Sequence, residues 1–283
     1  MSDCHVESRN GGKKSLPVNN ERFLPAIAGL GMTKVAPEDR RLYNGFAMLP
    51  AFSLVIPAFN EASRIGETLR ATLRYLENVS PQSELIVVND GSTDATSTIA
   101  RGALAGAKVE ARLLENFPNR GKGHAVRKGL LAAQRPIGLF SDADLSTPLE
   151  ETPKLVEPIA NNEVDLAFGS RALDRSLIGQ HQPWRREQGG RVFNLIVRVA
   201  TGLPFWDTQC GFKAFRLDVF RPILQRTETD GFGFDVELLY LARKANLRMK
   251  EIPVRWNHFE GSKVSFARDS VRMLREVAAL RRR

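Results

Sequence analysis

Short apolar runs alternate with helix-like segments in the first part of this chain, and this alternation limits the possible folds more than any other feature. In chain order, we expect strands at 53–56, 85–88, 109–114, 137–140 and 164–168, alternating with helices at 65–76, 94–104, 122–133 and 153–159. Strands that are apolar along their whole length must be covered on both faces, as in a parallel sheet enclosed by helices. The sequence therefore predicts an α/β fold with a Rossmann-like, mostly parallel twisted sheet and helices on both faces.

The alternation stops after the fifth expected strand. Beyond it we expect a helix at 188–202, a strand at 210–215, a helix at 234–245 and an extended segment at 248–256. Residues 1–20 are polar and without periodicity, which is typical of a disordered tail, and 21–49 show no clear pattern. We therefore predict a partly disordered N-terminal tail over 1–49, one domain over 50–261 and a C-terminal helix over 262–283.

The expected C-terminal helix is basic and amphipathic. The whole chain has a net charge of +9, and residues 262–283 contain seven Lys or Arg against two acidic residues, an excess of five positive charges. Apolar residues recur in this segment at helical spacing, with arginines between them. Such a helix can lie on an anionic membrane surface, or it can pack its apolar face on the domain. Both alternatives remain open.

Composition excludes several classes of protein. With 42% hydrophobic and 26% charged residues, the chain has the make-up of a soluble globular protein, and no stretch reaches the ~18 apolar residues of a membrane-spanning helix. Asp3, Glu7 and Arg9 precede any apolar stretch, so no secretory signal is expected. Cys4 and Cys210 are too few for a disulfide framework or a zinc site, and we expect free thiols. We therefore expect a cytoplasmic protein, either in solution or peripheral at the inner face of the membrane.

Polar residues follow three of the expected strands at the point where each strand ends. They form the segments Pro57-Ala58-Phe59-Asn60-Glu61, Asn89-Asp90-Gly91-Ser92-Thr93-Asp94 and Asp142-Ala143-Asp144. The carboxyl ends of parallel strands share one edge of the sheet, where open α/β folds bind their ligands, so the three segments should meet in one crevice. There Asp90 could accept a hydrogen bond from a nucleobase, and Gly91 would let a ligand approach the backbone. A turn followed by a helix cap explains the same residues.

Asp142 and Asp144 stand two positions apart at the third of these strand ends. Two carboxylates with this spacing can share a divalent cation, and Mg²⁺ typically takes one or two carboxylates together with substrate phosphates and water. The alternative is a turn in which both Asp side chains bond local backbone. The polar ends of the neighbouring strands favour the metal site.

Two glycines flank a lysine at the expected start of the 122–133 helix, in Arg120-Gly121-Lys122-Gly123-His124. The segment is not a Walker A loop, because Asn116 stands where the first glycine belongs and Gly123 replaces Ser or Thr. A lysine at a helix start opposes the helix dipole, which indicates a bound anion such as a diphosphate. A flexible glycine loop with a solvated lysine is the alternative.

Eight segments, taken in order, resemble the inverting glycosyltransferases of family 2, which have the GT-A fold. Within that family the chain is most similar to the polyprenyl-phosphate (dolichyl-phosphate) β-glucosyltransferases and mannosyltransferases. The resemblance runs from Leu54 to about Phe266 and rests on Val55-Ile56-Pro57-Ala58-Phe59-Asn60-Glu61, Val88-Asn89-Asp90-Gly91-Ser92-Thr93-Asp94, Asn119-Arg120-Gly121-Lys122-Gly123, Asp142-Ala143-Asp144-Leu145-Ser146-Thr147-Pro148, Gly169-Ser170-Arg171, Asp207-Thr208-Gln209-Cys210-Gly211-Phe212-Lys213, Phe234-Asp235-Val236-Glu237 and Gly261-Ser262-Lys263. Each segment alone is weak evidence, but eight in the family's order form a specific signal.

The resemblance also implies roles for individual residues. The nucleotide sugar would be bound by Pro57, Ala58, Asn60, Glu61, Asp90, Gly91, Lys122, Asp142 and Ala143, and the acceptor phosphate by Arg171, Lys213 and Lys263. Asp144 would bind Mg²⁺ or Mn²⁺, and Asp207 would lie close to the metal and the sugar. His258 could be a further metal ligand or an ordinary surface histidine.

The implied reaction is transfer of a hexose, with inversion, from a nucleotide sugar to a lipid phosphate at a membrane, without nucleic acid as a partner. Mannosyl relatives often have Gln where this chain has Ser146, so the segment favours glucose from UDP-glucose over mannose from GDP-mannose. A lipid phosphate is already anionic and needs no base. A hydroxyl acceptor would need one, and Asp207 and Asp235 are the candidates.

Three other interpretations remain. A glycosyltransferase of the same family could act on a soluble or polysaccharide acceptor, and a sugar-phosphate nucleotidyltransferase would also be a metal-dependent α/β enzyme. The net charge alone suggests a basic nucleic-acid-binding protein, but the excess lies in a tail without interleaved aromatic residues. The oligomeric state is open.

Overall fold

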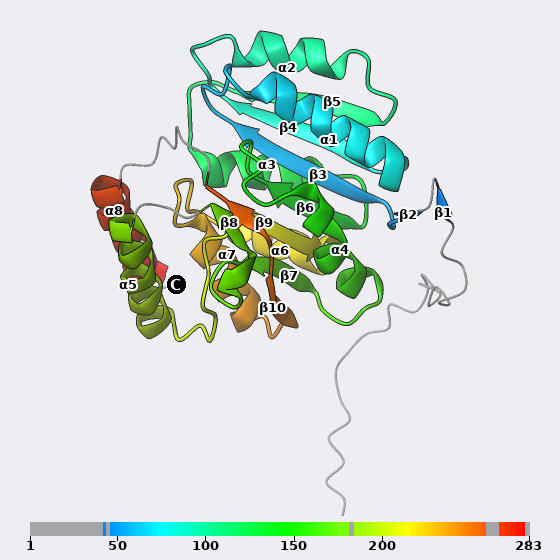
Figure 1. The fold of residues 1–283 in the computed structure, drawn as a ribbon. Coiled ribbons are helices and arrows are strands. Elements are labelled where there is room, and N and C mark those ends of the chain that lie inside the picture. The colour runs from blue at the N-terminus through cyan, green and yellow to red at the C-terminus, as the bar shows by residue number, and fades with distance from the viewer. Residues whose placement is uncertain (1–41, 44–45, 181–183, 259–265, 281–283) are drawn as a thin grey trace, which may run out of the picture. The chain divides into compact units, whose positions relative to one another are not determined.

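The structure is a computed structural model, and it describes residues 42–43, 46–180, 184–258 and 266–280 (Figure 1). Its strands are β1 (Leu42–Tyr43), β2 (Phe46–Ala47), β3 (Phe52–Ala58), β4 (Glu84–Asp90), β5 (Glu110–Asn116), β6 (Ile137–Ser141), β7 (Leu166–Ser170), β8 (Ile178–Gln180), β9 (Phe212–Arg216), β10 (Met249–Pro253) and β11 (Trp256–Asn257). Its α-helices are α1 (Ile65–Val79), α2 (Thr96–Leu104), α3 (Lys122–Ala132), α4 (Thr152–Ala160), α5 (Trp184–Thr201), α6 (Leu217–Arg226), α7 (Phe234–Lys244) and α8 (Phe266–Leu280).

Seven strands form the central sheet, in the order β10-β7-β9-β6-β3-β4-β5. Strand β9 runs antiparallel to both of its neighbours, and every other pair in this sheet is parallel. The predicted mostly parallel α/β sheet is therefore confirmed. The carboxyl ends of β3, β4 and β6 lie at one edge, as the parallel arrangement requires.

Helices cover both faces of the sheet because successive residues of a strand point to opposite sides. Leu54 and Ile56 of β3 pack in a core with α1, α2 and α4, whereas Val55 packs on the opposite side with α3, α6 and α7. All seven residues of β3 and of β4 are buried, as are all five of β6 and of β7. This burial explains why these strands are continuous apolar runs in the sequence.

Two features of the second half differ from the sequence prediction. Helix α6 was not predicted, because Arg221 and Pro222 interrupt the spacing of the apolar residues that it buries. The extended segment predicted at 248–256 is two strands, of which β10 joins the central sheet and β11 pairs with β8 in a separate two-stranded sheet. The buried Cys210 is a free thiol, as expected.

The C-terminal helix α8 packs its apolar face on the domain. Met273, Val277 and Leu280 are buried in the same core as Phe193 and Val197 of α5, and α5 and α8 lie side by side (Figure 1). Of the two alternatives for this basic helix, packing on the domain holds for these residues. None of the helices in the described parts of the chain has the length and apolar character needed to cross a membrane.

Parts of the sequence prediction lie outside the described residues. These are most of the expected tail over 1–49, Cys4, and the segment 259–265 that contains Lys263. The limits given for the domain therefore stay a prediction.

Candidate active site

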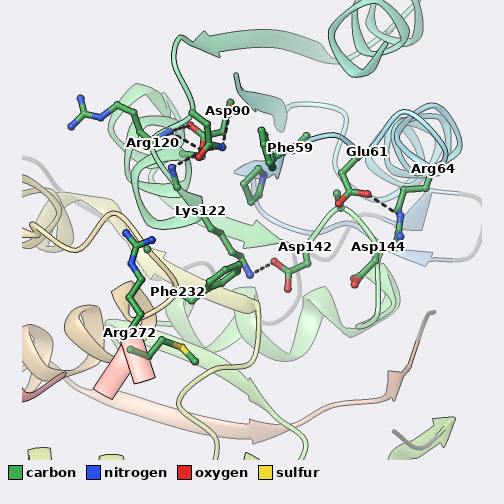
Figure 2. A pocket seen from close by; sticks show the side chains of 18 residues that line it. Phe59, Glu61, Arg64, Asp90, Arg120, Lys122, Asp142, Asp144, Phe232 and Arg272 are labelled. Atoms are coloured by element: carbon green, nitrogen blue, oxygen red, sulfur yellow. Dashed lines mark hydrogen bonds and ion pairs between the residues drawn. The ribbon is translucent and has the colours of Figure 1, made fainter. Parts of the chain in front are cut away.

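A pocket opens at the sheet edge where β3, β4 and β6 end (Figure 2). It is lined by Pro57, Ala58, Phe59, Glu61, Arg64, Asp90, Asn119, Arg120, Gly121, Lys122, Ala125, Asp142, Ala143, Asp144, Gly231, Phe232, Arg272 and Met273. All three polar strand ends contribute to this lining, so the predicted convergence is confirmed. The start of α3, the loop before α7 and helix α8 complete the wall.

Asp90 organises the loop that enters α3. Its carboxylate accepts hydrogen bonds from the side-chain amides of Asn116 (2.7 Å) and Asn119 (2.8 Å) and from the backbone N–H groups of Arg120 (3.2 Å) and Gly121 (2.7 Å). Because four donors bind this carboxylate, its role in this structure is to hold the loop of residues 119–121 in place. The residue lies in the pocket as expected, and its contact with a nucleobase stays a prediction.

Asn60 and Gly91 do not belong to the pocket lining but shape it. The side-chain oxygen of Asn60 accepts from the backbone N–H of Thr93 (2.8 Å), and the backbone N–H of Asn60 donates to the hydroxyl of Ser92 (2.9 Å). Gly91 has φ +71°, a conformation that suits glycine, and a Cβ there would overlap the backbone of Asn119. Asn60 thus joins the ends of β3 and β4, and Gly91 allows the loop at Asn119 to approach the end of β4.

Lys122 forms an ion pair with Asp142 inside the pocket. Its ammonium lies 2.5 Å from Oδ1 of Asp142, and both side chains remain partly open to solvent (Figure 2). Burial alone would lower the pKa of Lys122, but the carboxylates of Asp142, Asp235 and Asp144 outweigh burial and raise it. Lys122 is therefore a permanent cation at the start of α3.

The turn after β6 gives Asp142 and Asp144 different surroundings. The backbone N–H of Asp142 donates to the carbonyl of Gly211 (3.2 Å), and a Cβ at Gly211 would overlap the Asp142 carboxylate. Oδ1 of Asp144 accepts only the backbone N–H of Ser146 (2.9 Å) among the bonds described, and Leu145 between them has φ +49°. Asp142 is thus held between Lys122 and Gly211, and Asp144 faces the pocket beside it.

These residues fit a divalent cation in part. Mg²⁺ and Mn²⁺ take oxygen ligands, and a site made of one or two carboxylates is completed by substrate phosphates and water. Asp144 and Asp142 supply such carboxylates on one wall of the pocket. Within the described part of the chain, no group of three or more His, Cys, Asp or Glu is placed to hold a metal.

His258 is not brought to the carboxylates. Its backbone N–H donates to the carbonyl of Gln180 (3.0 Å), and its ring stacks on Trp256 with centroids 6.0 Å apart. It does not line the pocket. Within the described residues His258 is thus not grouped with Asp144, and its role as a further metal ligand stays a prediction.

Asp207 and Arg171 form a bidentate ion pair outside the pocket lining. Nε and Nη2 of Arg171 donate to the two carboxylate oxygens of Asp207 at 2.6 and 2.8 Å, and the Arg171 backbone N–H adds a third bond (3.0 Å). Burial alone would raise the pKa of Asp207, but Arg171 outweighs burial and lowers it. The Asp207 side chain is 2% exposed and that of Arg171 is 29% exposed, so only the arginine can meet a ligand from solvent.

Lys213 and Asp235 form a fully enclosed ion pair. The Lys213 ammonium donates to Asp235 (2.6 Å) and to the carbonyl of Cys210 (2.6 Å), and its side chain has no exposed surface. Burial raises the pKa of Asp235, which Lys213 and Lys122 offset only partly. In this structure the Lys213 ammonium is enclosed, and its contact with an acceptor phosphate, expected from the sequence, stays a prediction. For the same reason Asp235 has no access to an acceptor hydroxyl in this structure.

Several lining residues were not singled out from the sequence. Arg120 and Phe59 lie inside segments that carried the family resemblance, and that position was the available signal. Arg272 and Met273 belong to the C-terminal helix, for which the sequence left two alternatives, contact with a membrane surface and packing on the domain. Nothing in the spacing of α8 distinguishes Arg272 from its neighbours, so only the tertiary structure reveals it.

Comparison with known proteins relates the chain to a family of glycosyl transferases. The model of glycosyl transferase family 2 matches residues 53–224. The chain is 38% identical over 227 residues to the dolichyl-phosphate beta-glucosyltransferase of Drosophila melanogaster, covering 75% of this chain and 69% of that protein. It is 32% identical over 252 residues to the protein of the same name from Saccharomyces cerevisiae, covering 81% of this chain and 73% of the yeast protein.

Solved structures share the fold. Glucosyl-3-phosphoglycerate synthase from Mycobacterium tuberculosis, in complex with Mn²⁺, UDP-glucose and phosphoglyceric acid, superposes with a TM-score of 0.58 at 21% identity, covering 81% of this chain and 80% of that one. The complex with phosphoglyceric acid gives a TM-score of 0.60 with the same coverage. The predicted GT-A fold is confirmed.

Proposed function

Because the chain belongs to glycosyltransferase family 2, we propose that it transfers glucose from UDP-glucose to a polyprenyl (dolichyl-type) phosphate with inversion. The relatives named as dolichyl-phosphate beta-glucosyltransferases support the sugar and the acceptor class. The observation that carries the proposal is the pocket itself, in which Asp142 and Asp144 lie beside Lys122 at the carboxyl edge of the sheet.

Charge in the pocket suits a nucleoside diphosphate. Lys122, Arg120 and Arg272 line it together with the two carboxylates, so it offers cations to phosphate oxygens and carboxylates to a metal. When bound, Mg²⁺ or Mn²⁺ held by Asp144, with Asp142 at its side, would neutralise charge on the departing diphosphate. Lys122 supplies a second fixed positive charge there, and it stays protonated because its pKa is raised.

The reaction is an in-line displacement at the anomeric carbon of the sugar. An oxygen of the acceptor phosphate forms the new bond to this carbon, the bond to the diphosphate breaks, and UDP leaves with the electron pair. The phosphate oxygen is already anionic, so no proton must be removed.

The ion pairs of the site favour this acceptor over a hydroxyl. Asp207 and Asp235, the two carboxylates considered as general bases, are paired with Arg171 and Lys213 and are almost completely buried. A hydroxyl acceptor needs a general base, so one of these two carboxylates would first have to break its ion pair. Arg171 is partly exposed and is our proposed contact for the acceptor phosphate. The proposal places the enzyme in the cytoplasm at a membrane that carries the lipid.

A donor and acceptor screen tests the proposal. UDP-glucose, UDP-galactose and GDP-mannose are each incubated with a short-chain polyprenyl phosphate, with phosphoglycerate or with buffer, and products are identified by mass. We expect a glucosylated polyprenyl phosphate and free UDP, dependent on Mg²⁺ or Mn²⁺ and absent in Asp144→Asn. Product formation only with GDP-mannose would contradict the proposed donor. Product formation only with phosphoglycerate would contradict the proposed acceptor. Synthesis of nucleotide sugar from a nucleoside triphosphate would indicate a nucleotidyltransferase.

A further inference from the structure

Two side chains outside the pocket lining hold Asp90 in place. Asp90 itself lines the pocket beside Arg120 and Lys122 (Figure 2). Asn116, the last residue of β5, is buried and donates through Nδ2 to the Asp90 carboxylate (2.7 Å). The same Nδ2 lies 3.0 Å from Nδ1 of His124, in the first turn of α3. A chain of three side chains therefore begins at the pocket wall and continues to Asn116 and His124, which do not line the pocket.

The orientation of the Asn116 amide is fixed by a charged group on each side. Nζ of Lys128 donates to Oδ1 of Asn116 (2.8 Å) and to the backbone carbonyl of Glu115 (2.7 Å). An ammonium is only a donor and a carboxylate is only an acceptor, so the amide oxygen must face Lys128 and the amide nitrogen must face Asp90. A flipped amide would oppose two donors on one side and two acceptors on the other.

This orientation determines the protonation state of His124. The amide nitrogen of Asn116 is only a donor, so Nδ1 of His124 must accept from it. The imidazole is therefore neutral, with its proton on Nε2. Protonation of Nδ1 would place two donors face to face and leave one N–H of the buried Asn116 without an acceptor.

The surroundings of His124 favour the same neutral form. Arg120 precedes α3, and Arg127 of α3 forms an ion pair with Asp230 (2.6 Å) in the loop before α7. The backbone N–H of His124 donates to the carbonyl of Asp230 (3.3 Å). Burial, together with Arg120 and Arg127, lowers the pKa of His124, and the carboxylates of Asp230 and Asp90 offset this only partly.

We propose that Asn116 and His124 are positioning residues for binding of the nucleotide sugar, because together they hold Asp90. The Asp90 carboxylate also accepts from the backbone N–H of Gly121 (2.7 Å), so its position determines where α3 begins and where Lys122 lies. Neutral His124 keeps the second N–H of Asn116 paired and thereby keeps the amide directed at Asp90. The choice of UDP-glucose as the nucleotide sugar rests on the proposed function.

Binding of UDP-glucose to the full chain, measured by calorimetry with Mn²⁺ and without acceptor, tests these roles. His124→Leu removes the acceptor for Asn116, and at neutral pH we expect it to raise the Kd by about three- to tenfold. His124→Asn is the matched variant, because its side-chain oxygen can accept the same bond, and it should bind like wild type. Equal Kd values for wild type and His124→Leu would overturn the proposal. Equal weakening in both variants would also overturn it, because lost packing would then be the cause.

Acidification provides a readout that packing alone would not change. Neutral His124 is the form that supports binding, so the Kd of wild type should rise as pH falls below the ordinary histidine pKa of about 6.5. His124→Asn has no titrating group at this position and should show a smaller rise. UDP-glucose is the probe because its diphosphate is esterified at both ends, whereas a terminal phosphate ionises near pH ~6. The same pH dependence in wild type and His124→Asn would contradict the role of His124.

Failure of the proposed function is recognised separately. Wild type that binds GDP-mannose in place of UDP-glucose would contradict the proposed donor. The Kd values of the variants for GDP-mannose would then decide the roles of Asn116 and His124 by the same criteria. Absence of binding of either nucleotide sugar by wild type would overturn both proposals.

Discussion

Asp142 and Asp144 lie in the same turn after β6, but they have different neighbours and therefore different roles. Asp142 is paired with Lys122 and confined by Gly211, so it cannot turn freely toward a metal. Asp144 bonds the backbone of Ser146 through one oxygen. We therefore infer that Asp144 is the principal metal ligand and that Asp142 sets the position of Lys122.

Replacing Asp144 by Asn tests this division of roles. We expect Asp144→Asn to lower the rate of glucosyl transfer by about 100-fold or more. Mutation of residues that only hydrogen-bond to a metal ligand already lowers metal affinity or activity by about 10- to 100-fold, and loss of the ligand itself should cost at least as much. The midpoint of urea unfolding should change little, because the side chain is partly exposed. The readouts are initial rates over a range of Mn²⁺ concentrations, together with urea unfolding. Unchanged metal dependence would contradict the assignment.

Arg272 provides a test of the wall that α8 contributes. Its side chain lines the pocket and its Nε donates to Glu276 (3.1 Å), which in turn accepts from the backbone N–H of Gly233. Arg272→Ala should raise the KM for the nucleotide sugar about three- to tenfold, a modest effect because the side chain is 70% exposed and its charge is screened by water. Arg275→Ala, an exposed neighbour outside the pocket, is the control. Equal KM values for both variants would exclude a role for Arg272 in donor binding.

At the level of single residues, the sequence predicted which residues line the pocket better than it predicted which charged residues are buried in ion pairs. Pro57, Asp90, Lys122, Asp142 and Asp144 were predicted, because a parallel sheet brings its strand ends together whatever the side chains do. Burial, by contrast, depends on what packs above a residue. A lysine on a strand can be a ligand or a core ion pair, and the local pattern around Lys213 is the same in both cases.

At the scale of elements, the Lys213–Asp235 pair joins β9 to the start of α7. We expect Lys213→Met to lower the free energy of unfolding by about 3–5 kcal/mol, because it leaves a buried carboxylate without its partner. The double variant Lys213→Met/Asp235→Leu should recover part of this loss. Urea unfolding of the two single variants and the double variant measures the coupling. Additive losses would show that the two side chains do not stabilise each other.

At the level of elements, the first half of the chain was predictable because its strands are short continuous apolar runs, whereas its helices have apolar residues at helical spacing. The second half was less so: α6 has a proline inside it, and the direction of β9 depends on a distant pairing with β6 and β7. The apolar residues of α5 were recognised as helical, but periodicity cannot tell which side remains uncovered.

At the scale of the whole molecule, acidic groups determine how stability depends on pH. Burial alone would raise the pKa of Glu84, Glu151 and Asp207, but their hydrogen bonds and cationic neighbours outweigh burial and lower it, and hydrogen bonds from Arg248 lower that of Asp165. Stability from these four groups is present above the ordinary carboxyl pKa and is lost as pH falls through their lowered values. Asp235, with its raised pKa, acts in the opposite direction.

We therefore expect the free energy of unfolding to fall as the pH is lowered below ~4, because four groups outnumber one. Urea unfolding at a series of pH values from about 3 to 7 measures this dependence. Asp207→Asn should be less stable at neutral pH and should show a shallower loss on acidification. Stability that increases on acidification would assign the dominant role to Asp235.

Strand β9 lies in the middle of the sheet although it is made late in the chain. Strands β7 and β6 have no pairing with each other, and each joins the other only through β9. A chain still being synthesised, and ending before Phe212, therefore has an open edge on β6 and a β7 strand without its inner neighbour. Protease sensitivity of stalled chains should drop once residues 212–216 have emerged from the ribosome. The order of synthesis thus leaves β6 and β7 unjoined until β9 has emerged, when β10 is the one strand of the central sheet still to be made.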